Sequence, residues 1–90
     1  MRFEWDPEKA VHNREKHGVT FEEAQTVFED DLFIVFGDPD HSMNEKRYLI
    51  MGQSKAGQLL VVSYTERSQR IRLISARPAT RRERKAYEES

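Results

Sequence analysis

The sequence is poor in several features on which small proteins often depend. Its 90 residues include no cysteine, which excludes a disulfide framework, a thiolate zinc site and a cysteine nucleophile. No apolar run approaches the roughly 18 residues that a membrane-spanning helix needs, and the N-terminus has no signal-peptide pattern. We therefore expect a single cytoplasmic domain over residues 1–90.

Phosphate-loop and metal-binding patterns are also missing or weak. The four glycines are scattered singly, so no glycine-rich phosphate loop is present. His12 and His17 are five residues apart in a predicted helix and point in different directions, which argues against a shared metal ion. Asp38, Asp40 and His41 offer an alternative cation site, although a solvated acidic turn is the simpler interpretation. We expect neither a metal ion nor a cofactor.

The net charge of −1 conceals two halves of opposite sign. Residues 1–45 contain four basic and twelve acidic side chains, whereas residues 46–90 contain eleven basic and four acidic ones. Such asymmetry is typical of a protein that binds nucleic acid or another charged partner. The alternative is that the two halves neutralise each other within the fold.

The first helix is predicted from its two ends. Residues 2–5 alternate in polarity, as a short strand requires. Asp6 then provides an N-cap carboxylate, and Pro7 is tolerated at the first helical position. The helix is expected to end at about His17, because Gly18 favours a left-handed helix end.

A second helix is expected directly after the first. Thr20 and Glu23 form a capping-box pattern, in which each side chain satisfies a backbone donor of the other residue. Four apolar side chains then recur on one helical stripe, which predicts a buried face. They are Phe21, Ala24, Val27 and Phe28.

The remainder of the chain predicts an antiparallel meander and a short C-terminal helix. Strands are expected over residues 32–37, 45–53, 59–65 and 70–77, separated by turn-forming segments. Thr80 and Glu83 form another capping-box pattern, which opens a helix through about Tyr87. The predicted class is therefore α+β, with the order β-α-α-β-β-β-β-α.

The predicted hairpin of residues 59–77 is unusually rich in arginine. Guanidinium groups gathered near a sheet end suit bidentate capture of phosphate. Strict alternation places Arg70 and Arg72 on one face and Arg77 on the other, more apolar face. The structural alternative is an internal salt bridge of Arg67 or Arg77, with Glu66 or with the acidic first half.

Four segments of the sequence together resemble the BrnT family of toxins from type II toxin–antitoxin systems. They are FEWDPEKAVHNREKHGVTFEEAQTVFED (3–30), EKRYLIMGQS (45–54), VVSYTER (61–67) and RIRLISARPATRRERKAY (70–87). The match covers nearly the whole chain, and the order and spacing of the segments are more specific than any one of them. The resemblance implies a RelE-like fold and a ribonuclease that cleaves RNA and so arrests translation.

The resemblance also implies which residues act on RNA. Metal-independent cleavage by the neighbouring 2′-hydroxyl needs a stabilised phosphorane and two proton transfers. Arg67 and Arg77 are the expected phosphate-holding residues. The expected proton-transfer candidates are Glu66, Tyr64 and His17, although a helix cap is the slightly preferred interpretation of His17 and a core position is the commoner one for Tyr64. Further RNA-binding candidates are Arg47, Arg81, Arg82, Arg84 and Tyr87.

Family membership would bring a protein partner as well as RNA. The resemblance implies neutralisation by a BrnA-type ribbon-helix-helix antitoxin, in a two-plus-two complex that binds DNA only through the antitoxin. Arg81 and Arg82 lie at an unfavourable helix end, which suggests that the C-terminal helix meets RNA or acidic antitoxin residues. The alternative function is a non-catalytic nucleic-acid-binding or adaptor module that uses the same basic hairpin.

Overall fold

The computed structural model describes residues 2–37 and 46–90, so the predicted loop with Asp38, Asp40 and His41 lies outside the described residues. The order of elements agrees with the sequence prediction. The elements are β1 (Arg2–Glu4), α1 (Pro7–His17), α2 (Phe21–Thr26), a 3-10 helix η1 (Val27–Glu29), β2 (Ile34–Gly37), β3 (Tyr48–Gln53), β4 (Leu59–Arg67), β5 (Arg70–Pro78) and α3 (Arg81–Glu89). None of these helices is long and apolar enough to cross a membrane.

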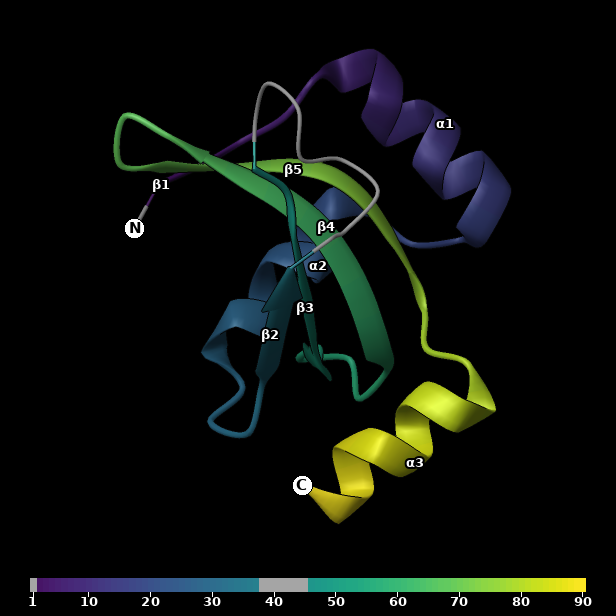
Figure 1. Cartoon of the computed structure of the whole chain (residues 1–90). Helices are drawn as coiled ribbons and strands as arrows, with labels where there is room; N and C mark the ends of the chain where they lie inside the picture. Colours follow the sequence, from purple (N-terminus) through teal and green to yellow (C-terminus); the bar gives the residue numbers. More distant parts are fainter. Residues whose placement is uncertain (1, 38–45) are drawn as a thin grey trace.

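The five strands form one sheet in the order β1-β5-β4-β3-β2 (Figure 1). Strands β2 to β5 pair antiparallel, as the predicted meander requires. Strand β1 differs, because it pairs parallel with β5, with Arg2 opposite Arg70 and Glu4 opposite Arg72. The sheet is therefore mixed. A three-residue strand carries no local signal for the direction of its pairing, which depends on the path of α1 and α2.

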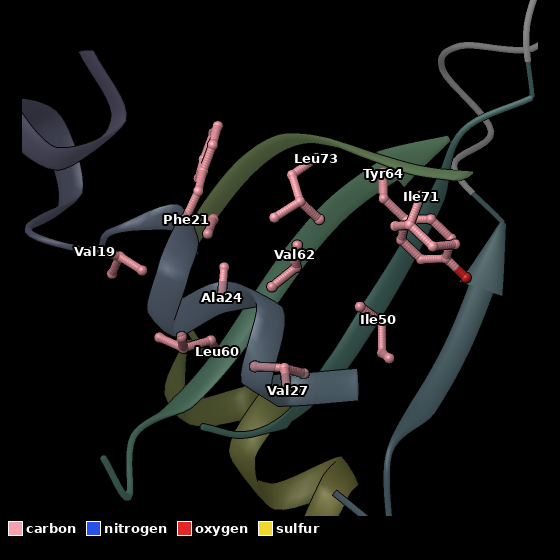
Figure 2. Close-up of a cluster of buried hydrophobic side chains, with 11 residues drawn as sticks. Val19, Phe21, Ala24, Val27, Ile50, Leu60, Val62, Tyr64, Ile71 and Leu73 are labelled. Atoms are coloured by element: carbon pink, nitrogen blue, oxygen red, sulfur yellow. The ribbon is translucent and has the colours of Figure 1, made fainter. Parts of the chain in front are cut away.

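The main core lies between the sheet and the helices α1 and α2. Phe21, Ala24 and Val27 are fully buried, which confirms the apolar stripe predicted for the second helix (Figure 2). They pack against side chains from one face of the sheet, including Val62 and Leu73. We call the opposite face of the sheet the open face. A smaller apolar cluster covers part of it and consists of Met51, Leu59 and Val61, packed by Ile34, Leu49, Ala79 and Tyr87.

A β-bulge in β5 overturns the predicted alternation of its side chains. Tyr64 pairs with Leu73 but Ser63 pairs with Ser75, so Ile74 is an extra residue without a partner of its own in β4. Residues after the bulge therefore change faces. Ala76 joins the main core, and Arg77, paired with Val61, lies on the open face together with Arg70 and Arg72.

The side chain of Asn13 in α1 holds β5 just after this bulge. Its Oδ1 accepts from the backbone N–H of Ala76 at 2.9 Å, and its Nδ2 donates to the carbonyl of the same residue at 2.9 Å. The amide thus takes the place of a neighbouring strand, since β1 reaches only as far as Arg72. Nδ2 also donates to the carbonyl of Val19 at 3.0 Å, which ties the start of α2 to the same point.

The capping box predicted at the start of α2 forms only in part. Thr20 Oγ1 accepts from the backbone N–H of Glu23 at 3.1 Å, as expected. The Glu23 carboxylate instead accepts a 2.7 Å hydrogen bond from the hydroxyl of Ser54 in the β3–β4 turn. A distant partner has therefore replaced the local one, and α2 is joined to the hairpin turn.

Replacing Asn13 with Ala should destabilise the fold strongly. The change leaves the N–H and carbonyl of Ala76 and the carbonyl of Val19 without the partners seen here, and each such loss costs about 1–3 kcal/mol. We expect the free energy of unfolding, measured by urea titration, to fall by about 3 kcal/mol or more. The neighbouring exposed change Arg14→Ala is the control and should cost less than about 0.5 kcal/mol. Equal effects of the two changes would contradict this role of Asn13.

Candidate nucleic-acid interface

The open face gathers arginines that are far apart in the sequence. Cross-strand pairing places five of them on this face, because directly paired residues project to the same side of a sheet. They are Arg2 of β1, Arg67 of β4, and Arg70, Arg72 and Arg77 of β5. Two carboxylates bonded to these arginines, those of Glu4 and Glu83, accompany them. Basic side chains therefore outnumber acidic ones among these residues, and Glu4 of the acidic first half pairs with two arginines of the basic second half.

Three of these arginines form a line across neighbouring strands at one end of the sheet. Arg2 pairs with Arg70, and Arg70 pairs with Arg67. We call these three residues the tip row. The turn that joins β4 to β5 beside the row has only two residues, Ser68 and Gln69, with φ angles of 48° and 67°. Both lie in the left-handed region that favours glycine, so the tight turn carries strain.

Glu4 bonds both Arg72, which is paired with it in β5, and Arg70 of the tip row. Its carboxylate accepts from Arg72 Nη1 at 2.9 Å and from Arg70 Nη1 at 3.4 Å. The hydrogen bond from Arg72 is the main cause that lowers the pKa of Glu4, and the bond from Arg70 adds to it. Glu4 therefore remains charged and orients Arg72 more closely than Arg70.

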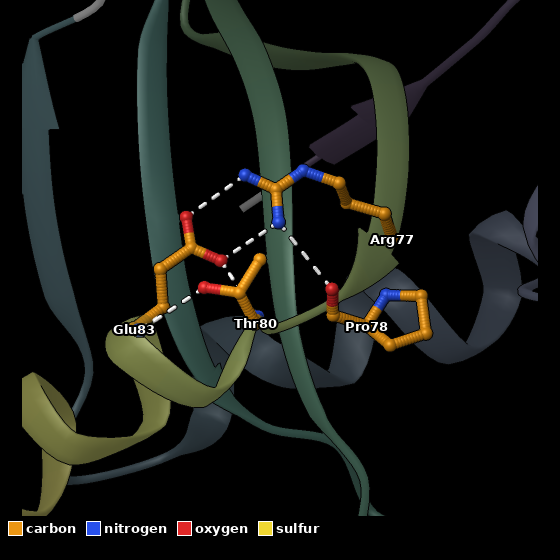
Figure 3. A network of polar contacts seen from close by, with 4 residues as sticks. All are labelled: Arg77, Pro78, Thr80 and Glu83. Carbon is orange, nitrogen blue, oxygen red and sulfur yellow. Dashed lines mark hydrogen bonds and ion pairs between the residues drawn. The ribbon is translucent and has the colours of Figure 1, made fainter.

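Arg77 makes a bidentate ion pair with Glu83 at the start of α3 (Figure 3). The two bonds run from Nη1 to Oε1 at 2.7 Å and from Nη2 to Oε2 at 2.9 Å, and Nη1 also donates to the carbonyl of Pro78 at 3.3 Å. The hydrogen bond from Arg77 lowers the pKa of Glu83 to about 2, and the same bond raises the pKa of Arg77.

Glu83 is at the same time part of the capping box of α3. Thr80 Oγ1 accepts from the backbone N–H of Glu83 at 3.1 Å, and Glu83 Oε1 accepts from the backbone N–H of Thr80 at 2.9 Å. The predicted capping box is therefore confirmed. The salt-bridge alternative for Arg77 also holds, but its partner is Glu83 rather than Glu66 or the acidic first half of the chain.

The structure does not bring Arg67 and Arg77 together. Arg67 pairs with Arg70 beside the hairpin turn, whereas Arg77 pairs with Val61, six residues earlier in β4. At the rise of a β-strand this separation is about 20 Å. Figure 1 shows the turn and α3 at opposite ends of the β4–β5 hairpin. The two predicted phosphate-holding arginines therefore lie at different ends of the open face, because the last residues of antiparallel strands lie at opposite ends.

Tyr87, an expected RNA-binding residue, joins α3 to the rest of the fold. Its hydroxyl donates a 2.6 Å hydrogen bond to Asp30 Oδ2, and this bond is the main cause that raises the pKa of Tyr87 to about 12. Burial alone would raise the pKa of Asp30, but bonds from Tyr87 and from the N–H groups of Gln53 and Leu32 lower it overall. Tyr87 therefore has a structural role in this arrangement.

The three proton-transfer candidates lie away from the open face. Tyr64 is buried in the main core, stacked on Tyr48, and burial raises the pKa of its hydroxyl. Glu66 is exposed but pairs with Ile71, whose side chain faces the main core. His17 ends α1 and lines a surface hollow with Lys9. In the part of the chain that the structure describes, no three His, Asp or Glu side chains gather as a metal site.

The remaining RNA-binding candidates lie near the open face without forming one cluster. Arg47 is half-buried, next to Lys46, whose carbonyl accepts from Thr65 Oγ1 at 2.8 Å. Arg81, Arg82 and Arg84 are exposed on α3.

Several residues of this surface escaped the sequence analysis. They are Arg2, Glu4, Asp30 and the side chain of Glu83 as a partner of Arg77. Of these, only Glu83 could have been predicted from the sequence. Its capping box follows Arg77 by six residues and so places a carboxylate near the end of β5.

Residues 5–83 match the sequence profile of a family described as the ribonuclease toxin BrnT of type II toxin–antitoxin systems. The fold is similar to the 1.1 Å crystal structure of the Brucella abortus ribonuclease toxin BrnT, with a TM-score of 0.65 and 21% sequence identity. The likeness covers 90% of this chain and 99% of that one, and it establishes the fold. No curated protein matches the chain.

The Arg77–Glu83 pair should make the stability of the fold depend on pH below about 5. A carboxyl whose pKa falls from 4.5 to about 2 on folding stabilises the native state above pH 4.5, and this contribution is lost as the pH falls toward 2. Glu83→Gln removes the titrating group. Between about pH 5 and pH 2 the melting temperature of the variant should therefore fall less than that of the unmodified protein. The matched control is Glu88→Gln in the same helix, and identical pH curves for all three proteins would refute the assignment.

Proposed function

This chain belongs to the BrnT family of ribonuclease toxins from type II toxin–antitoxin systems, and from that premise we propose that it cleaves RNA on the open face of its sheet. The observation that carries the proposal is the gathering of five arginines from three strands on that face. The RNA cleaved is in the cytoplasm, and its cleavage arrests translation.

The proposed reaction needs no metal ion. The 2′-oxygen of the substrate forms a bond to the adjacent phosphorus, and the bond from phosphorus to the 5′-oxygen breaks. One proton leaves the 2′-hydroxyl and one is taken up by the 5′-oxygen, so that the products end in a 2′,3′-cyclic phosphate and a 5′-hydroxyl. Guanidinium groups stabilise the charge that develops on the phosphorane oxygens, which is usually the largest catalytic contribution of such sites.

Arg67 is the better of the two predicted phosphate-holding residues. It lies opposite Arg70 in the neighbouring strand, so an RNA strand whose scissile phosphate is at Arg67 has a further guanidinium group beside it. Arg77 gives three N–H bonds to Glu83 and Pro78, and these bonds join its strand to the start of α3. We therefore propose that Arg67 holds the scissile phosphate and that Arg77 fixes α3. In the alternative, Arg77 holds the scissile phosphate through the N–H groups that it does not give to Glu83 and Pro78. Substitution of Arg77 by Lys, rather than of Arg67, would then lower kcat.

Proton transfer by protein side chains contributes less to the proposed rate enhancement than the arginines do. The open-face groups bonded to the arginines titrate far from neutrality, since the pKa of Glu83 is about 2 and the pKa of Glu4 is lowered. Tyr64 and His17 lie on the helix side of the sheet, and we assign neither of them to the reaction. Charge stabilisation by arginine thus accounts for most of the proposed rate enhancement.

We also propose a two-plus-two complex with a BrnA-type antitoxin, since a toxin of this type has an antitoxin partner. The edge strand β2 and the turn before it are the surface that supports this. Four large apolar side chains are exposed there: Leu32, Phe33, Val35 and Phe36. Natural edge strands are usually protected by charge or proline, and a bare apolar edge indicates a partner.

The cleavage proposal is tested with purified protein, RNA and EDTA. We expect cleavage to persist in EDTA and the products to carry cyclic phosphate and 5′-hydroxyl ends. Arg67→Lys should keep the melting temperature but lose about 10²-fold or more in kcat, because a point charge cannot replace a bidentate fork. Arg77→Lys should lower the melting temperature and keep the rate per folded molecule.

A change on the helix side of the sheet serves as the control for this pair. His17→Gln should leave kcat unchanged, because α1 lies across the sheet from Arg67. The reverse pattern, with kcat lost in Arg77→Lys and kept in Arg67→Lys, would move the scissile phosphate to Arg77. Retention of RNA without any cleavage would instead support the non-catalytic binding module.

The antitoxin proposal is tested on the β2 edge. Val35→Lys places a charge on this apolar edge and should weaken antitoxin binding, on the order of tenfold or more, without changing RNA cleavage. Val11→Lys introduces the same charge on exposed α1 and should leave the affinity unchanged. Light scattering of the unmodified complex should give two copies of each chain. A 1:1 heterodimer at micromolar concentration would refute the stoichiometry, and equal affinities of the two variants would refute the site.

A further inference from the structure

We propose that the tip row of Arg2, Arg70 and Arg67 is a phosphate-binding subsite that follows the backbone of single-stranded RNA beyond the cleaved bond. The inference rests on the proposed function only in taking RNA as the ligand. It assigns Arg2 and Arg70 to the phosphates next to the one held by Arg67, and it gives the bound strand a direction, across the sheet from β4 toward β1.

The geometry of the row suits a linear polyanion. Neighbouring strands are about 4.8 Å apart, so the backbones of Arg2 and Arg67 are separated by two such steps, about 10 Å. Arg70 lies between them in the same register. The guanidinium groups therefore form a line rather than a single pocket. A surface hollow of about 430 Å³, lined by Arg2, Ser68, Gln69 and Arg70, opens beside this line.

The pairing of Arg2 with Arg70 is costly for the folded protein. Like charges directly opposite each other on neighbouring strands are destabilising. The two-residue turn that keeps Arg67 opposite Arg70 adds strain, because neither Ser68 nor Gln69 is a glycine. Repulsion between arginines and a strained turn at the same end of the sheet are expected where that end binds a ligand.

Glu4 is the carboxylate that lies among the arginines of β1 and β5. Arg2 and Glu4 of β1 lie opposite Arg70 and Arg72 of β5 on the open face. The carboxylate bonds Arg72 more closely than Arg70, at 2.9 Å against 3.4 Å. Phosphate oxygens accept bidentate guanidinium bonds, so the N–H groups that Arg70 does not give to Glu4 can bind a phosphate together with those of Arg2.

The test is the salt dependence of binding to a 2′-O-methylated RNA, which lacks the attacking hydroxyl and cannot be cleaved. For single strands the slope of log K against log salt is about −0.7 for each phosphate contacted. Arg2→Gln and Arg70→Gln should each make the slope less negative by about 0.7, and the double variant by about 1.4. Affinity should fall roughly tenfold for each change. Arg70→Lys should keep the slope, because it keeps the charge.

Arg14→Gln on α1 removes the same charge from the other side of the sheet and should leave the slope unchanged. Melting temperatures identify any variant that is misfolded. Arg2→Gln, at the exposed edge of the sheet, should disturb the fold less than Arg70→Gln, which removes a bond to Glu4. Unchanged slopes in a protein that still cleaves RNA would overturn the tip row and leave the proposed function intact. No binding by the unmodified protein would overturn both. Unchanged slopes with weaker antitoxin binding would show that the row receives acidic antitoxin residues instead.

Discussion

The pairing register of the β4–β5 hairpin determines which side chains project from the open face. A two-residue turn fixes Arg67 opposite Arg70, and the extra residue Ile74 later moves Arg77 onto the same face. Asn13 then holds the strand at Ala76, beyond Arg72, where the pairing with β1 ends. A shift of one residue in this pairing would turn the arginines toward the core. The basic surface therefore depends on a turn, a bulge and one buried amide.

The Arg77–Glu83 pair connects this surface to α3. One carboxylate completes the capping box of the helix and also accepts both bonds from the guanidinium of a strand. Tyr87 holds the other end of α3 through Asp30, close to the turn before β2. The C-terminal helix is thus attached at two points, and its exposed arginines are presented at a fixed place beside the open face. Arg77 contributes to function in this view by positioning α3.

Different regions of the surface are suited to different proposed partners. The second half of the chain supplies β4, β5 and α3, and with them most of the open-face arginines. The more acidic first half supplies α1 and α2, which cover the other face. The bare apolar edge at β2 lies at the far side of the sheet from β1 and the tip row. RNA and antitoxin therefore have separate proposed surfaces, which the variants at Arg2 and Val35 distinguish.

The sequence by itself determined the helices and strands and their order, because helix caps and apolar periodicity are local signals. It also determined the family resemblance, through four segments in a specific order and spacing. Asp6, Gly18, Thr80 and the buried stripe of α2 all behave as predicted. Only the tertiary structure decided the parallel pairing of β1, the bulge, the roles of Asn13 and Glu83, and the separation of Arg67 from Arg77. These depend on which residues meet across strands, and strict alternation fails once one strand contains an extra residue. Strand pairing and hydrogen bonds between distant residues carry no local pattern, which is why the arginines of the β4–β5 hairpin were noted from the sequence but their arrangement was not.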